Sequence, residues 1–222
     1  MVTDLFDFMG GHDAKQKPWM ADKEFILGTV ENLDSIIDAC ISSGRYAIDL
    51  ETTGLDNRVF TVEGVARTVD KIAGVGLSPD GVRGYYIPIG HSKLENDGTH
   101  SPLPCNIPKP IFTAAFKRLV AATEAGKTFA VFHNAKFDQE FLQFNDTGEP
   151  WGTWDKPGTW DDTMLLAYLR NSRARRRGLK YLAAALPDAR PETETGGPGL
   201  GMEMIKLHEL WGHDKEKGDF AY

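Results

Sequence analysis

The spacing of apolar and polar residues predicts a chain in which strands and helices alternate. Apolar runs typical of strands cover residues 23–30, 46–51, 68–77, 83–89 and 128–132. Apolar residues recur at helical spacing over residues 31–43, 111–123, 135–144, 162–169 and 179–186. The turn residues at 78–81, Ser-Pro-Asp-Gly, favour a hairpin between the two strands beside them. We therefore expect an α/β fold: a mixed sheet flanked by helices, with three antiparallel strands before a parallel one.

Segments without periodicity divide the rest of the sequence. The mixed composition of residues 1–22 predicts a loosely ordered N-terminal arm. Residues 55–70 are interpreted as an insertion after the second predicted strand. Loops are expected over residues 91–110, 149–158 and 193–201. Residues 23–222 are then expected to form one domain.

The composition suits a globular protein and argues against binding to nucleic acid by bulk charge. Of 222 residues, 41% are hydrophobic, and the net charge is −7 with a pI of about 5.4. Cys40 and Cys105 match no zinc spacing and indicate no disulfide framework, which fits a reducing cytoplasm. His91 and His133 have no partner at metal-ligand spacing, which favours structural roles. We find no signal peptide and no apolar run of the roughly 20 residues that cross a membrane, so no membrane contact is expected.

Two acidic residues end the second predicted strand. Asp49 and Glu51 are two positions apart, so their side chains leave the same face, roughly 7 Å apart at about 3.3 Å of rise per residue. Like charges on a core strand repel each other and lose hydration unless something compensates them. A divalent cation that prefers hard oxygen ligands, Mg²⁺ or Mn²⁺, would compensate them best. The alternative is a solvated strand end with two harmless surface acids.

A third carboxylate, Asp138, follows another predicted strand. Asn134 is expected to be the N-cap of the helix over 135–144. Asp138 then lies in the first helical turn, near the strand ends, where it can complete a metal site with Asp49 and Glu51. The alternative is an ordinary acid, favoured near a helix N-terminus by the helix dipole.

Two further groups of polar residues have both a structural and a functional interpretation. Asp161 or Asp162 is expected to cap the apolar helix over 162–169, and a cap needs no further function. A basic cluster that includes Arg175 and Arg176 is a candidate contact to the phosphates of single-stranded DNA. The alternative for this cluster is a solvated loop between two helices.

Three motifs give the sequence a specific resemblance. The runs are DLETTGL at 49–55, HNAKFD at 133–138 and DTML at 162–165. They resemble the first two exonuclease motifs, and the helix after them, of the 3′–5′ proofreading domain of family A (polymerase I type) DNA polymerases. That domain belongs to the DEDD exonuclease superfamily. The resemblance covers about residues 23 to 222, and the order and spacing of the elements fit as well as the motifs.

The resemblance implies an RNase H-like fold and hydrolysis of the 3′-terminal phosphodiester of single-stranded DNA by two ions, Mg²⁺ or Mn²⁺. Carried over by position, the catalytic and metal-binding residues are Asp49, Glu51 and Asp138. The substrate-binding residues are Thr52, Leu55, Asn134 and Phe137, with Asp162, Arg175 and Arg176 as further candidates. The expected partner is a DNA 3′ end, in bacterial or viral replication.

The sequence departs from the family at the third motif. That motif, Tyr-x-x-x-Asp or a His with Asp five residues later, supplies the fourth carboxylate and is not found here. We therefore expect a domain incomplete at its C-terminus, weak or inactive by itself, with a polymerase domain in a longer parent chain. Asp214 or Asp219 as a substitute ligand is the alternative. Two other functions remain open: an exoribonuclease similar to ribonuclease D, and a catalytically silent module that binds nucleic acid or a partner protein.

Overall fold

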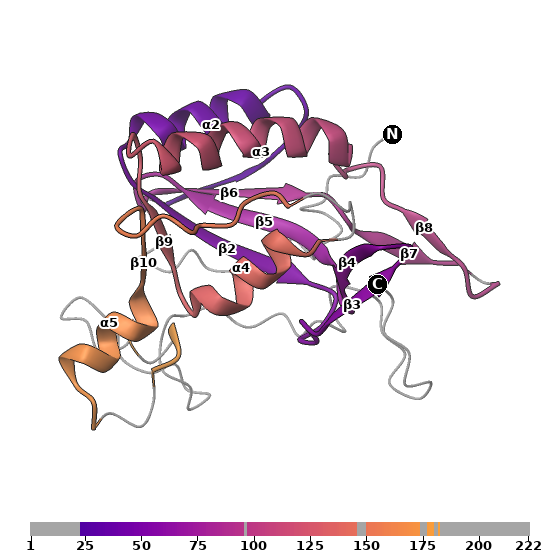
Figure 1. The fold of residues 1–222 in the computed structure, drawn as a ribbon. Helices are drawn as coiled ribbons and strands as arrows, with labels where there is room; N and C mark the ends of the chain where they lie inside the picture. The colour runs from indigo at the N-terminus through magenta and orange to yellow at the C-terminus, as the bar shows by residue number, and fades with distance from the viewer. Residues whose placement is uncertain (1–22, 96, 146–149, 174–176, 180–181, 183–222) are drawn as a thin grey trace, which may run out of the picture.

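A mixed sheet organises the part of the chain that the computed structural model describes, which is residues 23–95, 97–145, 150–173, 177–179 and 182. Within these residues the sheet has six strands in the order β1-β6-β5-β2-β9-β10 (Figure 1). The strands are β1 (Glu24–Leu27), β2 (Tyr46–Thr52), β5 (Ile72–Ser78), β6 (Arg83–Pro88), β9 (Ala130–Phe132) and β10 (Trp160–Asp162).

The strand pairing follows the predicted order. β2, β5 and β6 pair antiparallel, and β9 pairs parallel to β2. The prediction of three antiparallel strands followed by a parallel one is confirmed, and so is the mixed sheet flanked by helices. The outer strands add parallel pairs, β1 to β6 and β10 to β9. β10 was not predicted, because three residues are too few to give a periodic pattern.

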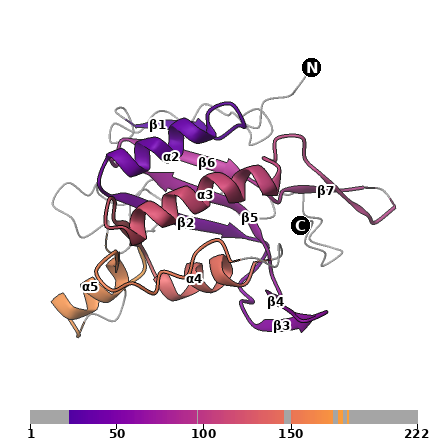
Figure 2. The same cartoon turned by 45° about the horizontal axis from the view of Figure 1, so that its top comes forward.

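Two helices cover one face of this sheet. α2 (Leu33–Ser42) and α3 (Lys109–Glu124) lie side by side over it, as both views show (Figures 1 and 2). The buried side chains of α3 include Phe112, Phe116 and Leu119, which confirms the apolar stripe predicted from helical spacing. Along β2, buried and exposed residues alternate, so one side of the strand faces these helices.

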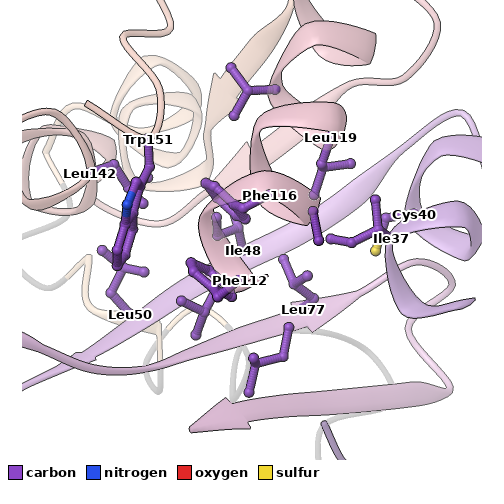
Figure 3. Close-up of a cluster of buried hydrophobic side chains, with 14 of the residues drawn as sticks. Ile37, Cys40, Ile48, Leu50, Leu77, Phe112, Phe116, Leu119, Leu142 and Trp151 are labelled. Atoms are coloured by element: carbon purple, nitrogen blue, oxygen red, sulfur yellow. The ribbon is translucent and has the colours of Figure 1, made fainter. Parts of the chain in front are cut away.

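The core lies between these helices and the sheet. In Figure 3, Phe112 and Phe116 of α3 lie close to Ile48 and Leu50 of β2, and Trp151 closes one end of the cluster. The ring centroids of Phe112 and Trp151 are 4.9 Å apart in an edge-to-face contact. Each large side chain buried in this way contributes about 1.5–3 kcal/mol. This packing fixes the position of β2.

The remaining helices lie apart from α2 and α3. α4 (Ala135–Gln143) runs near β2, and α5 (Thr163–Arg170) continues directly from β10 (Figure 1). α4 buries Phe141 and Leu142, as its spacing predicts. The apolar helix α5, by contrast, has no fully buried residue among the described ones.

Two small hairpins lie outside the main sheet. The predicted insertion forms β3 (Val59–Val62) and β4 (Val65–Thr68). The segment predicted as a loop over 91–110 contains β7 (Ser92–Leu94) and β8 (His100–Pro102), which corrects that prediction. The predicted arm, most of the helix at 179–186 and the loop at 193–201 lie outside the described residues. In the described part of the chain, no helix has the length and apolar character needed to span a membrane.

Candidate functional site

The two acids of the first motif lie on the face of β2 that α2 and α3 leave open. Both Asp49 and Glu51 are on the exposed side of the strand, so they share one face as predicted. Across the antiparallel pair, Asp49 is opposite Gly76 and Glu51 is opposite Gly74. Glycine at both positions leaves no β5 side chain directly beside the acids. The open face is therefore accessible at this point.

Asp138 reaches the same stretch of β2 from the first turn of α4. Its side chain is buried, and its Oδ1 accepts a hydrogen bond of 3.2 Å from the backbone N–H of Leu50. Leu50 is the residue between Asp49 and Glu51. β9 pairs with β2 only at the first two residues of β2, so the strand edge beyond them needs another acceptor. The third acid is thereby fixed next to the first two.

Asp162 joins the N-termini of two helices. Its buried carboxylate accepts a hydrogen bond of 2.8 Å from the N–H of Met164, which starts α5. The same carboxylate accepts hydrogen bonds from the N–H groups of Asn134 at 3.0 Å and Ala135 at 2.9 Å, which start α4. The predicted capping role is confirmed for Asp162 and extends to α4. Asp162 consequently fixes the helix that carries Asp138.

Asn134 is the N-cap residue of α4, as predicted, although its side chain accepts no capping hydrogen bond. Its backbone has φ 69° and ψ 51°, in the left-handed region. Asn adopts this conformation more readily than most residues. The Asp162 carboxylate accepts hydrogen bonds from the N–H groups of Asn134 and Ala135, so a side chain at the end of β10 caps α4.

Loss of hydration raises the pKa of all three acids. Burial, and secondly the Asp49 charge, raise the pKa of Asp138 to about 8. Loss of hydration and then the Asp49 charge raise the pKa of Glu51, and loss of hydration raises the pKa of Asp49. Asp49 and Glu51 keep exposed surface, so solvent screens their repulsion more than that of the buried Asp138. A cation beside them would favour the charged form of all three.

The chemistry of these donors fits a hard divalent cation. All three side chains offer carboxylate oxygens, the ligands that Mg²⁺ and Mn²⁺ prefer. Burial and the neighbouring Asp49 charge raise the pKa of Asp138, and a bound cation would offset both effects. In the described part of the chain, no three Asp, Glu, His or Cys side chains converge tightly enough to form a complete metal cluster. The three acids are therefore neighbours around β2 rather than a closed cage.

A tyrosine beside the acids was not identified from the sequence. Tyr86 of β6 is the register partner of Gly76, and its Oη lies 2.2 Å from where a Cβ on Gly74 would be. The Oη is 2.6 Å from Nε2 of the buried His91, which agrees with a structural role for that histidine. Burial, and then the charge of Glu51, raise the pKa of Tyr86. Two glycines within β5 are the sequence signal of such a close approach.

His133 places a second polar atom near Asp49. Its Nδ1 lies 2.8 Å from Oγ1 of Thr163, and that hydroxyl donates to the carbonyl of Phe132 at 3.0 Å. Because the hydroxyl proton is used in that bond, Nδ1–H is the donor to the Thr163 hydroxyl. Nε2 is buried and has no hydrogen-bond partner within the described residues. After burial, His133 is the next influence on the pKa of Asp49, which it lowers.

The other predicted site residues lie around the acids. Leu55 is 84% exposed on the loop after β2, and the Thr52 hydroxyl donates to a carbonyl of that loop at 2.6 Å. Phe137 is half-buried in α4. The assignment of these three residues to substrate binding remains a prediction. Arg175 and Arg176 lie outside the described residues.

Comparison with solved structures identifies the fold. The EXO domain of Aedes aegypti Nibbler matches over 84% of this chain and 78% of that chain, with 10% identity and a TM-score of 0.50. Trypanosoma brucei RNase D matches over 86% and 60%, with 15% identity and a TM-score of 0.49. Brucella melitensis NrnC with bound Mg²⁺ matches over 86% and 72%, with 19% identity and a TM-score of 0.47. No protein-family model and no curated protein sequence matches the chain. The mixed sheet and its flanking helices have the RNase H-like fold that the sequence implied.

Proposed function

We propose that this chain is a metal-dependent 3′–5′ exonuclease domain of the proofreading type, which removes nucleotides from the 3′ end of single-stranded DNA. The observation that carries the proposal is the grouping of Asp49, Glu51 and Asp138 around one stretch of β2, each with a raised pKa. Acids that lose hydration and repel one another cost stability. Their grouping therefore favours a function that requires them.

In this proposal Asp49, Glu51 and Asp138 hold two divalent ions through their carboxylate oxygens. Such ions supply an activated water and stabilise the charge that develops on the leaving 3′ oxygen. The protein holds the acids in place: the N–H of Leu50 orients Asp138, and Asp162 fixes the start of α4. The buried Nε2 of His133 is proposed to orient a water or a substrate group beside Asp49.

The substrate contacts are proposed for two segments next to the acids. Thr52 ends β2 and Leu55 lies in the loop after it, while Asn134 and Phe137 lie at the start of α4. Together they would surround the terminal nucleotide. DNA is the proposed polymer because the motifs resemble a proofreading domain, and RNA is the alternative, since the same chemistry acts on both.

Digestion of 5′-labelled oligonucleotides tests this function. In Mn²⁺, the chain should shorten single-stranded DNA one nucleotide at a time from the 3′ end, and an RNA of the same sequence more slowly. We expect slow turnover, because a fourth carboxylate is not assigned. Asp49→Ala should abolish the shortening. The matched control is Asp161→Ala, which removes an exposed acid of β10 and should leave the rate unchanged.

Two results would change this conclusion. Equal shortening by the wild-type chain and Asp49→Ala would contradict the proposed site. Shortening of RNA with DNA left intact would keep the site and replace the proposed polymer.

A catalytically silent binding module is the second candidate. The absence of a converged metal cluster among the described residues favours it. This candidate predicts binding of single-stranded DNA that is independent of Mn²⁺, with no shortening at any enzyme concentration.

A further inference from the structure

The β3–β4 hairpin is a separate two-stranded ribbon that begins shortly after the first motif. Its turn residues, Glu63 and Gly64, both have positive φ angles, 51° and 81°, as in a tight type I′ turn. A two-stranded ribbon is marginally stable without further support. The position of this hairpin therefore depends on the contacts of its open end, where the two strands join the rest of the chain.

Hydrogen bonds hold the open end of the hairpin, opposite its turn, next to the acids. The Asp70 carboxylate accepts from the Thr53 hydroxyl at 3.0 Å and from the N–H of Asp56 at 2.7 Å, which ties the hairpin to the loop after β2. The N–H of Thr68 donates to the carbonyl of Phe144 at 2.7 Å, at the end of α4. Figures 1 and 2 show the hairpin beyond the end of β2, near α4.

Two more contacts fix the same junction. The Asn57 side-chain amide donates to the carboxylate of Glu140, which lies on α4 two residues after Asp138. At Gly54 a Cβ would lie 2.4 Å from Oδ2 of Asp70, so a larger residue there would displace the Asp70 carboxylate from its hydrogen bonds. The hairpin is thus attached to both elements that carry the acids.

One face of the hairpin carries an aromatic ring, Phe60, and a guanidinium group, Arg67, that has no ion-pair partner among the described residues. Phe60 is opposite Arg67 and Val62 is opposite Val65, so these four side chains share a face. Phe60 is 44% exposed and Val62 is 42% exposed. Within the described residues, the Arg67 guanidinium has no hydrogen-bond or ion-pair partner, and its Nε is buried without an acceptor. Arg58, by contrast, is paired with Asp56, with Nε to Oδ1 at 2.8 Å.

We propose that this face binds single-stranded nucleic acid next to the 3′ end, with a base on Phe60 and a phosphate oxygen on Arg67. The inference rests on the proposed function, because it assigns the strand that leads to the acids. Aromatic side chains stack on any base, and Arg binds phosphate through its planar fork of donors. An arginine with no acceptor among the described residues, on an apolar face of an acidic protein, fits a polyanion better than an apolar protein surface.

Anisotropy of a 5′-fluorescein-labelled oligodeoxythymidine measures this binding, with Ca²⁺ in place of Mn²⁺ so that the strand stays intact. Phe60→Ala and Arg67→Ala should each raise Kd by about fivefold or more. Arg67→Ala should also lower the slope of log Kd against log salt by about one. The controls are Val59→Ala, on the other face of the hairpin, and Arg58→Ala, whose cation is already paired; both should stay within about twofold.

Photocrosslinking gives a second measurement that does not depend on a variant. An oligonucleotide with 5-iodouracil at internal positions near the 3′ end should crosslink to the peptide that contains Phe60. Crosslinks only to peptides outside residues 59–68 would overturn the inference.

The outcomes separate this inference from the proposed function. If Phe60→Ala and Arg67→Ala bind as the wild-type chain does, while shortening still requires Asp49, the hairpin assignment is wrong and the exonuclease stands. If both variants weaken binding but no shortening occurs in Mn²⁺, the hairpin assignment stands and the exonuclease is wrong. A hairpin that docks a protein instead would leave the oligonucleotide affinity of both variants unchanged.

Discussion

Among the acids of the site, Asp138 is the residue whose charge the fold opposes most. It is buried, it faces the Asp49 charge, and the backbone hydrogen bonds from Leu50 and from Asp138 itself offset only part of the cost. Asp49 and Glu51 keep contact with solvent on the open face of β2. Without a cation, the stability of the protein should therefore respond to pH mainly through Asp138.

We expect the free energy of unfolding, measured in EDTA, to fall as pH rises from about 5 to about 9. An unfolded Asp titrates near pH 4, whereas the pKa of folded Asp138 is about 8. Between these values the folded state holds the extra proton, and a higher pH removes that advantage. Urea unfolding across this range should show a loss of about 1–4 kcal/mol.

Asp138→Asn is the control for this pH dependence. The amide cannot titrate, so the profile of the variant should be nearly flat over the same range. A variant that loses stability with the same slope as the wild-type chain would show that another group is responsible.

At the scale of elements, the helix termini determine where the site residues lie. The Asp162 carboxylate accepts hydrogen bonds from N–H groups at the start of both α4 and α5. One side chain therefore caps two helices. We expect Asp162→Ala to lower the free energy of unfolding by about 2–4 kcal/mol, because buried donors in both helices lose their acceptor.

Urea denaturation at pH 7 measures this effect. Asp161→Ala is the control, since Asp161 is exposed one residue earlier in the same strand and should change stability by less than about 0.5 kcal/mol. Equal stabilities of the two variants would show that Asp162 does not link the helices.

The sequence predicted the elements with long periodic patterns and missed those fixed by distant partners. The alternation of buried and exposed residues along β2 and the apolar stripe of α3 could be predicted, because each pattern repeats several times. β10 and the β7–β8 hairpin have only three residues per strand. The N-cap position of α4 was predicted, but the group that accepts its N–H hydrogen bonds was not, because Asp162 lies 28 residues from Asn134.

The sequence likewise predicted the part of the site that lies within one strand, but not the contacts between elements. The shared face of Asp49 and Glu51 follows from the two-residue repeat of a strand. The contact of Asp138 with Leu50 depends on where β9 stops pairing with β2, which no local pattern reports. Tyr86 reaches the site from β6 across a glycine of β5, so its position is visible only in the folded sheet.

At the scale of the whole molecule, the sheet has one face covered by helices and one face that carries the candidate site. α2 and α3 bury one face, and their apolar side chains pack against β2 (Figure 3). The other face carries Asp49 and Glu51, with Asp138 entering beside them. A change in the acids should therefore alter metal binding while the fold persists.

The central claim is that Asp49, Glu51 and Asp138 act together on a divalent cation. Titration of the chain with Mn²⁺, followed by the loss of the free-ion signal in electron paramagnetic resonance, tests it most directly. We predict saturable binding that weakens by about tenfold or more in Asp49→Ala and in Asp138→Asn, and that is unchanged in Asp161→Ala. Mn²⁺ binding of equal affinity in the wild-type chain and in both site variants would contradict the claim.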